Sequence, residues 1–265
     1  MSIRTFLQDI IEKDRWKAAQ RREQLFYSRR SEAIDKEEYF RLHQAYWRRM
    51  LAELPELEFS DDGLYIDVGC GPTTVLMSVP VGEKIGVDPL IDFYREHFHL
   101  AEDVRFIKGK VEDLNRLVGK KADVIFGMNS LDHIDNLAAI PAVLAEQLKP
   151  DGRLVVLLNV TRSPILGSIY STFGLYRILD PTHPHHFDSH RHVSRFFSGS
   201  FETLRSINVS HIRSSQTETE EEHEVMKREI PLIKRMIFAF LETIKKQDTY
   251  LFLMKPKGDR SPVTD

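Results

Sequence analysis

The spacing of apolar and polar positions changes once along this chain, and the change separates two regions. In the N-terminal region, apolar residues such as Phe6, Ile10 and Tyr39 recur at helical spacing. The polar turn "FSDDGL" follows, and after it short apolar runs alternate with stretches typical of helices. We therefore expect an N-terminal helical cap over residues 1–60 and a single globular domain over residues 61–265.

The apolar runs of the second region predict a parallel sheet. "LYIDVG", "KIGVDPL", "VRFIKGK", "ADVIFGMNS" and "GRLVVLLNV" are typical of buried strands, and "IPAVLAEQL" is typical of a helix. A helix is also expected to begin near Thr73. Because buried strands that alternate with helices form crossover units, the pattern predicts an α/β, doubly wound fold with a mostly parallel sheet.

The C-terminal third is less regular. Residues 161–200 are rich in Pro, Gly, aromatic residues and His, which is typical of a functional or mobile segment. "HVSRFFSGSFETL" predicts a short helix and "SINVSHIRS" a strand. A long helical insertion interrupted at Pro231 is expected next, before a last strand at "TYLFLMKP".

Composition narrows the class of protein. The chain has 265 residues, of which 42% are hydrophobic and 29% charged, as in soluble globular proteins. Its net charge of -3 gives no basic field for nucleic acid, although "RWKAAQRREQLFYSRR" is rich in Arg. The one cysteine, Cys70, excludes an intrachain disulfide and a zinc cluster of cysteines. With no signal peptide pattern and no run of about 20 apolar residues, a cytoplasmic protein that does not enter the membrane is expected.

The first strand ends in a loop that has almost no side chains. "LYIDVGCGPTTVL" places Asp67, Gly69 and Gly71 where parallel sheets bind ligands, and Asp88 follows about 20 residues later, where an acid meets ribose hydroxyls. A dinucleotide-binding loop needs a third glycine, but position 74 is Thr. A buried Asp67 would also repel a pyrophosphate, whereas it suits an ammonium or sulfonium group. The charge argument favours S-adenosylmethionine over NAD.

These motifs resemble those of a known superfamily. "YIDVGCGPTTV", "GVDP", "KGKVEDL", "ADVIFGMNSLDHIDN" and "LKPDGRLVVLLNV" have the order and spacing seen in class I S-adenosylmethionine-dependent methyltransferases. The resemblance is strongest over residues 62–160. It implies a Rossmann-like, seven-stranded sheet whose last strand is antiparallel.

The resemblance also implies which residues bind the cofactor: Asp67, Gly69, Gly71, Asp88, Pro89, Leu90, Glu112, Asp113 and Asn129. Asp88 would bind both ribose hydroxyls, and Leu90 would contact the adenine. The sequence departs from the family pattern at Lys110, which cannot accept a hydrogen bond from the adenine amino group. One of the two acids that follow would replace it. Asn129 closes the fourth strand, where the family lines the methyl-donor pocket.

Histidines gather in "DPTHPHHFDSHRH", residues 180–192, where the superfamily inserts substrate-binding elements. Methyl transfer needs alignment above all, but a hydroxyl acceptor also benefits from a base that titrates near neutral pH. The candidate catalytic residues are His133, His183, His185 and His186. A divalent metal bound by this segment is an alternative, but it is not expected because the spacing matches no zinc pattern. Another alternative is that this segment is a surface loop of solvated histidines. A further alternative concerns His133, which would support another residue of the site instead of acting as the base.

The resulting hypothesis is an S-adenosylmethionine-dependent methyltransferase that acts on a small molecule, at a hydroxyl of a sugar or secondary metabolite. An RNA methyltransferase and a non-catalytic S-adenosylmethionine-binding protein are the alternatives. The apolar stripe "MIFAFLETI" of the insertion is compatible with a wider substrate pocket or with a homodimer face, and the sequence does not decide between them.

Overall fold

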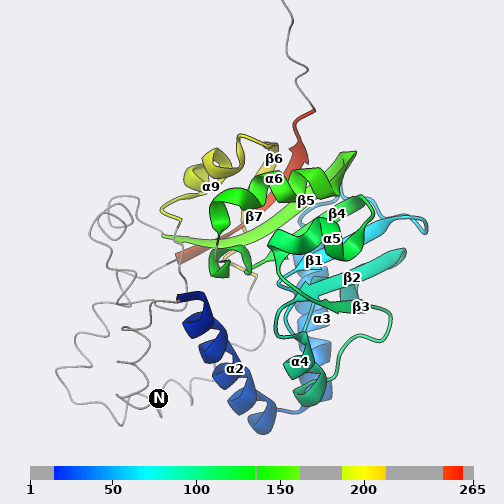
Figure 1. Ribbon diagram of the computed structural model, residues 1–265, viewed down its shortest axis with the longest axis vertical. Helices are drawn as coiled ribbons and strands as arrows, with labels where there is room; N and C mark the ends of the chain where they lie inside the picture. Colours follow the sequence, from blue (N-terminus) through cyan, green and yellow to red (C-terminus); the bar gives the residue numbers. More distant parts are fainter. Residues whose placement is uncertain (1–14, 135, 162–186, 213–246, 259–265) are drawn as a thin grey trace, which may run out of the picture.

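One sheet organises the computed structural model, which describes residues 15–134, 136–161, 187–212 and 247–258. Over these residues seven strands pair in the order β3-β2-β1-β4-β5-β7-β6 (Figure 1). Strands β1 to β5 are parallel, and β7 is antiparallel to both β5 and β6. The strands are β1 (Leu64–Val68), β2 (Glu83–Asp88), β3 (Arg105–Lys108), β4 (Ala122–Met128), β5 (Leu148–Thr161), β6 (Phe201–Asn208) and β7 (Gln247–Pro256). The predicted doubly wound α/β fold with an antiparallel last strand is confirmed.

Helices cover both faces of this sheet (Figure 1). Buried residues of α5, α6 and α9 pack on one face, and residues of α3 and the short helix η1 pack on the other. The α-helices are α2 (Arg15–Ala33), α3 (Lys36–Ala52), α4 (Ile91–His97), α5 (Leu114–Val118), α6 (Ile140–Gln147) and α9 (His190–Phe197). The 3₁₀ helices are η1 (Val75–Ser78), η2 (Val111–Asp113), η3 (Leu131–His133) and η4 (Leu137–Ala139). None of the helices in the described ranges is long and apolar enough to cross a membrane.

The apolar pattern of β1, which is broken by Asp67 near the end of the strand, follows from this two-sided burial. Leu64, Ile66 and Val68 belong to the core on the α5–α6 face, and Tyr65 belongs to the core on the α3 face. All five residues of the strand are buried. Since neighbouring side chains of a strand point to opposite faces, a strand that is covered on both sides needs apolar residues at consecutive positions.

One local prediction was right in position and another was wrong. The helix expected near Thr73 is the short 3₁₀ helix η1, whose N-cap residue Thr74 accepts a hydrogen bond from the Leu76 amide, and the chain is extended again at Val79. The predicted strand "SINVSHIRS" begins too late, since β6 starts at Phe201. That strand lies at the edge of the sheet and most of its side chains are exposed, so its sequence lacks the apolar pattern of a central strand.

The predicted N-terminal cap contributes two described helices, α2 and α3, which are called the cap helices below. Helix α3 is joined to the chain after β1 by two hydrogen bonds, in which Trp47 Nε1 donates to the Thr73 carbonyl at 2.7 Å and Gln44 Nε2 donates to the Met77 carbonyl at 2.9 Å. The division of the chain at residue 60 stays a prediction. The helical insertion before the last strand, with its apolar stripe, lies outside the described residues.

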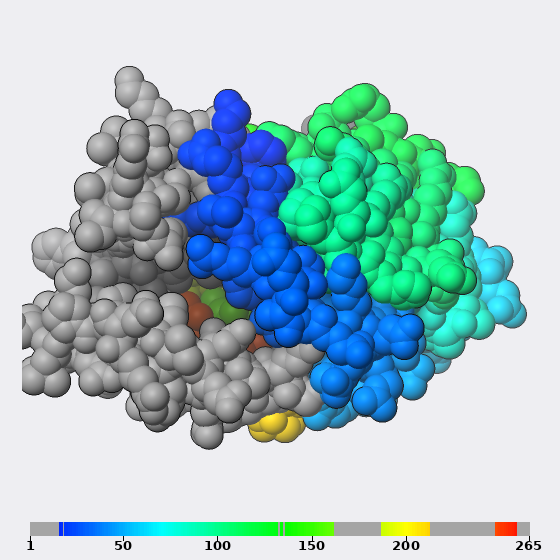
Figure 2. All heavy atoms as spheres, turned by 90° about the horizontal axis from the view of Figure 1, so that it is seen from below, coloured from blue at the N-terminus to red at the C-terminus, as the bar shows by residue number. Residues whose placement is uncertain are grey.

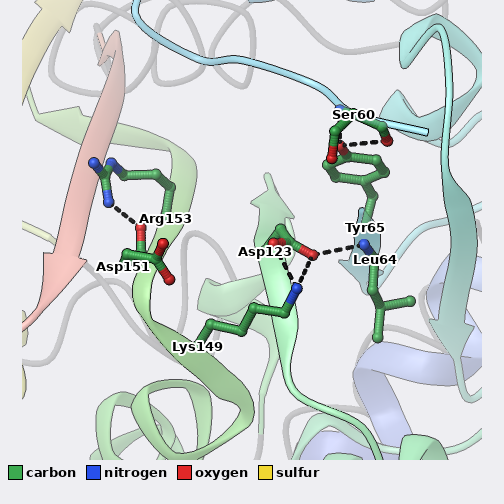
Figure 3. A network of polar contacts seen from close by, with 7 residues as sticks. All are labelled: Ser60, Leu64, Tyr65, Asp123, Lys149, Asp151 and Arg153. Atoms are coloured by element: carbon green, nitrogen blue, oxygen red, sulfur yellow. Dashed lines mark hydrogen bonds and ion pairs between the residues drawn. The ribbon is translucent and has the colours of Figure 1, made fainter. Parts of the chain in front are cut away.

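A polar network joins the amino ends of β1 and β4, two central strands of the sheet (Figure 3). The Asp123 carboxylate accepts hydrogen bonds from the Leu64 amide and from Lys149 Nζ, each at 2.8 Å. Tyr65 extends the network to the turn before β1, where its hydroxyl accepts a hydrogen bond from the Ser60 amide at 2.7 Å. These residues hold the amino ends of the strands together. In open α/β sheets ligands bind at the opposite end, beyond the carboxyl ends of the strands.

Candidate active site

The glycine loop after β1 presses against the end of β4. Gly69 and Gly71 have φ angles of +66° and +58°, in the left-handed region that favours glycine. A Cβ atom on Gly69 would lie 2.4 Å from the Cβ of Ser130, so no side chain fits there. A Cβ atom on Gly71 would meet only the Tyr27 hydroxyl, at 3.9 Å. The loop therefore leaves an open cradle at Gly71, between its own backbone and α2.

Asp88, at the end of β2, holds this loop in place. One carboxylate oxygen accepts a hydrogen bond from the Gly71 amide at 3.1 Å, and the other accepts one from the Leu90 amide at 2.8 Å. The residue is 4% exposed, and burial raises the pKa of its carboxyl group. Because a carboxylate has about four acceptor positions, two remain for the hydroxyls of a ligand in the cradle.

Asp67 supports the same loop from behind. Its Oδ2 atom accepts hydrogen bonds from the Thr74 hydroxyl at 2.6 Å and from the Val75 amide at 3.3 Å. Its Oδ1 atom is buried and has no hydrogen-bond partner among the described residues. Burial raises the pKa of Asp67 to about 7, against the two hydrogen bonds, which lower it. Asp67 therefore positions the turn after the glycines from a buried place behind the loop.

A cavity of about 730 Å³ opens at the carboxyl ends of the parallel strands. Several residues predicted to bind the cofactor or to act in catalysis line it: Gly69, Gly71, Asp88, Pro89, Glu112, Asn129 and His133. Asn129 adopts a φ of +54° where β4 ends, which turns the chain toward the cavity. The sequence pattern therefore located one wall of the cavity.

Other predicted residues lie elsewhere. Asp67 is behind the loop, as described. Leu90 packs in an apolar cluster with Ile91 and Tyr94, and Asp113 forms an ion pair with Arg116 at 3.2 Å. The candidates His183, His185 and His186 lie outside the described residues. Within the described part of the chain, no group of three or more His, Cys, Asp or Glu side chains could hold a metal ion.

The opposite wall of the cavity comes from the cap helices, whose atoms form a continuous blue band across the face shown in Figure 2. These lining residues were not among the predicted site residues; they are Trp16, Ala19, Gln20, Arg22, Glu23, Phe26 and Tyr27 of α2, and Tyr39, His43, Tyr46 and Trp47 of α3. Their spacing of three or four residues marks one face of each helix. That periodicity identifies the face, but not what lies opposite it.

Lys110, where the sequence differs from the family pattern, contacts the cavity wall that the cap helices form. Its Nζ atom lies 3.7 Å from the ring centroid of Trp16, over the face of the indole. Such a cation–π contact contributes about 0.5–2 kcal/mol, depending on how far it is desolvated. The lysine thus joins the loop after β3 to the first turn of α2, and Glu112 remains as an acid that lines the cavity there.

These residues fit S-adenosylmethionine. The cradle at Gly71 admits the ligand close to the backbone, the free acceptor positions of Asp88 suit ribose hydroxyls, and the Asp88 carboxylate beside the cradle would repel a pyrophosphate. When bound, the cofactor supplies a methyl group on a positively charged sulfur. The residues of the cradle and of the cap helices would orient it and exclude water from it, and such alignment is the main requirement of an in-line transfer.

The fold and this site are those expected of a class I S-adenosylmethionine-dependent methyltransferase. In agreement, residues 66–156 match the family model of a methyltransferase domain. The chain therefore contains a methyltransferase domain over residues 66–156, and its site fits S-adenosylmethionine as the methyl donor. No curated protein matches it by sequence.

Solved structures share the fold at low sequence identity. The cyclopropane synthase MmaA2 of Mycobacterium tuberculosis is 15% identical, with a TM-score of 0.54 and coverage of 79% of this chain and 83% of that one. Geranyl diphosphate C-methyltransferase of Streptomyces coelicolor A3(2) is 15% identical, with a TM-score of 0.53 and coverage of 82% and 80%. Phosphoethanolamine N-methyltransferase 2 of Haemonchus contortus is 14% identical, with a TM-score of 0.52 and coverage of 80% and 53%. These proteins differ in their acceptors, so the shared fold leaves the acceptor of this chain open.

The raised pKa of Asp67 predicts a pH dependence of stability. The pKa of about 7 means that the carboxyl group holds its proton up to about pH 7 in the folded protein, but in the unfolded chain it loses the proton near its ordinary pKa of 3.8. Between these values the unfolded chain binds fewer protons, so the free energy of unfolding falls as pH rises. Asp67→Asn cannot ionise. The difference in free energy of unfolding between this variant and the wild type should therefore shift in favour of the variant by about 2 kcal/mol from pH 5 to pH 8. Urea unfolding of both proteins at both pH values measures this shift.

Asp113→Asn is the control for this measurement, because it removes a partly exposed carboxylate that is paired with Arg116. Its stability relative to the wild type should change little between the two pH values. Asp88 is present in every protein compared, so its own titration contributes to all the curves. An Asp67→Asn variant that loses stability relative to the wild type as pH rises would show that the buried carboxylate is charged and stabilising.

Proposed function

We propose that this methyltransferase acts on a small molecule, at a hydroxyl group of a sugar or a secondary metabolite. The observation that carries the proposal is the cavity between the glycine loop and the cap helices. Its volume of about 730 Å³ falls in the range of about 300–1,000 Å³ typical of small-molecule sites. A cover of two helices over the carboxyl ends of the strands suits an enclosed acceptor rather than a long polymer.

The charges in the cavity support the same proposal. Acidic and basic side chains both line it, among them Glu23 and Arg22 of α2 and Glu112 and Lys110 after β3. A site for single-stranded nucleic acid would need a positively charged groove with stacking platforms. Two of the similar structures contain small-molecule acceptors, geranyl diphosphate in one and phosphomonomethylethanolamine in the other. The single cysteine of the chain suits a reducing compartment, so we propose the cytoplasm as its location.

The test is a transfer assay with S-adenosylmethionine labelled in its methyl group. The purified protein is incubated with separate pools of sugars, phenolic metabolites and total RNA, and the label is measured in each pool after separation. We expect label in a small-molecule pool. Label in RNA alone, lost as salt is raised, would establish the nucleic-acid alternative. Tight binding of S-adenosylhomocysteine without label in any pool would favour a non-catalytic binding protein.

A further inference from the structure

His43 is a cavity residue for which sequence analysis predicted no role. It lies on α3 and shares a helix face with Tyr39, Tyr46 and Trp47, which are three or four residues away. All four line the cavity. Trp47 anchors this face to the glycine loop through its hydrogen bond to the Thr73 carbonyl. The imidazole therefore lies on the wall that faces the cradle, held by a helix that is itself fixed to the cofactor loop.

Hydrogen bonding determines which nitrogen of His43 carries the proton. The Nδ1 atom lies 2.9 Å from the carbonyl oxygen of Tyr39. A carbonyl oxygen can only accept, so Nδ1 is the donor and carries the hydrogen. In the neutral ring, Nε2 then has a free lone pair. Among the described residues no hydrogen bond involves Nε2, while the ring packs against Tyr39 with centroids 4.2 Å apart.

The surroundings keep this imidazole neutral. Burial lowers the pKa of His43, and the positive charge of Arg30 on α2 acts in the same direction, against the hydrogen bond to the Tyr39 carbonyl. His43 is therefore a free base at neutral pH. The other titratable or charged side chains that line the cavity are Arg22, Glu23, Tyr27, Tyr39, Tyr46, Cys70, Asp88, Lys110, Glu112 and His133.

We propose that His43 is the general base of the methyl transfer, with Nε2 accepting the proton of the acceptor hydroxyl. The inference rests on the proposed function. As the acceptor oxygen bonds to the methyl carbon, its O–H bond breaks and the proton moves to Nε2, while the carbon–sulfur bond breaks and its electron pair stays on sulfur. The imidazolium ion that results then releases the proton to water. The anchored Nδ1–H holds the ring in one orientation during this step.

The test uses His43→Asn with two phenols as acceptor probes. The asparagine amide can still donate to the Tyr39 carbonyl, but it is not a base. With phenol at pH 8, release of S-adenosylhomocysteine should fall by about 100-fold or more, which is the usual contribution of a general base. With 4-nitrophenol, which is far more acidic and already ionised at this pH, the variant should retain most of the wild-type rate. Binding of S-adenosylhomocysteine, measured by calorimetry, should be unchanged.

His97→Asn is the matched control. His97 makes the same hydrogen bond, from Nδ1 to the Phe93 carbonyl four residues earlier at 2.9 Å, and its ring stacks on Phe93 at 4.3 Å. It does not line the cavity. This variant should therefore transfer methyl groups to both phenols at the wild-type rate.

Equal loss with both phenols would overturn the proposal, because it would show that His43 only supports the structure. An unchanged rate with phenol would overturn it as well. If neither phenol is methylated, nitrogen-15 NMR of the histidine rings tests the proposal, because it shows which ring nitrogen of His43 carries a proton and needs no methyl transfer. An Nε2 without a proton at pH 7 supports the proposal, and a protonated Nε2 overturns it. Failure of the proposed function would give a different result, which is seen in the wild type: it would not bind S-adenosylhomocysteine, or it would methylate RNA alone.

Discussion

Asp88→Ala is expected to weaken the binding of S-adenosylhomocysteine by about 100- to 1,000-fold. The variant loses the carboxylate positions assigned to two ribose hydroxyls, and hydrogen bonds to a charged group contribute about 1.5–3 kcal/mol each. It also loses the acceptors of the Gly71 and Leu90 amides, so the cradle itself is less ordered. Isothermal titration calorimetry of the purified protein with S-adenosylhomocysteine measures the change.

Asp92→Ala is the control for this experiment. Asp92 lies close in sequence, at the start of α4, but it is 54% exposed and pairs with Lys108 at 2.8 Å. It does not line the cavity, so its removal should leave the affinity unchanged. If Asp88→Ala bound S-adenosylhomocysteine as tightly as the wild type, the assignment of the ribose site would be wrong.

Alanine at Gly69 is expected to destabilise the protein by about 2–5 kcal/mol. The left-handed backbone costs an alanine about 1–2 kcal/mol, and the collision of its Cβ with Ser130 adds an overpacking cost of about 1–3 kcal/mol. Gly71→Ala has the same backbone cost without a collision, so its stability should fall by only about 1–2 kcal/mol. Its methyl group projects into the cradle, however, so binding of S-adenosylhomocysteine should weaken by at least about tenfold, the equivalent of about 1.4 kcal/mol.

Gly119→Ala separates backbone strain from collision and from cavity filling. Gly119 follows α5 with a φ of +70°, and a Cβ atom there would meet nothing within 4 Å. The Gly119→Ala variant should be as stable as Gly71→Ala, and it should bind S-adenosylhomocysteine as tightly as the wild type. Urea unfolding and calorimetry on the three variants give both quantities. Equal affinities for Gly71→Ala and Gly119→Ala would mean that the cofactor does not approach the loop at Gly71.

The sequence alone revealed the parts of the site that depend on neighbours in the chain. Gly71 lies just after β1 and Asp88 is the last residue of β2, and parallel strands bring their carboxyl ends to one side of the sheet. Their proximity could therefore be predicted, and it is seen in the hydrogen bond from the Gly71 amide to the Asp88 carboxylate. The edge strand β6 was misplaced because an exposed strand carries a weak pattern.

The sequence by itself thus determined the sheet, the glycine loop and the acid after the second strand, because strand periodicity and the conformational freedom of glycine are local properties. Only the tertiary structure decided which residues close the cavity. Helical periodicity marks the inner face of α2 and α3, but it does not say that Trp16 lies over Lys110 or that Tyr27 faces Gly71. Contacts between residues so far apart in the chain depend on how the cap helices pack, and that packing is set by the shape of the folded domain. The same packing brings His43 to the cavity wall.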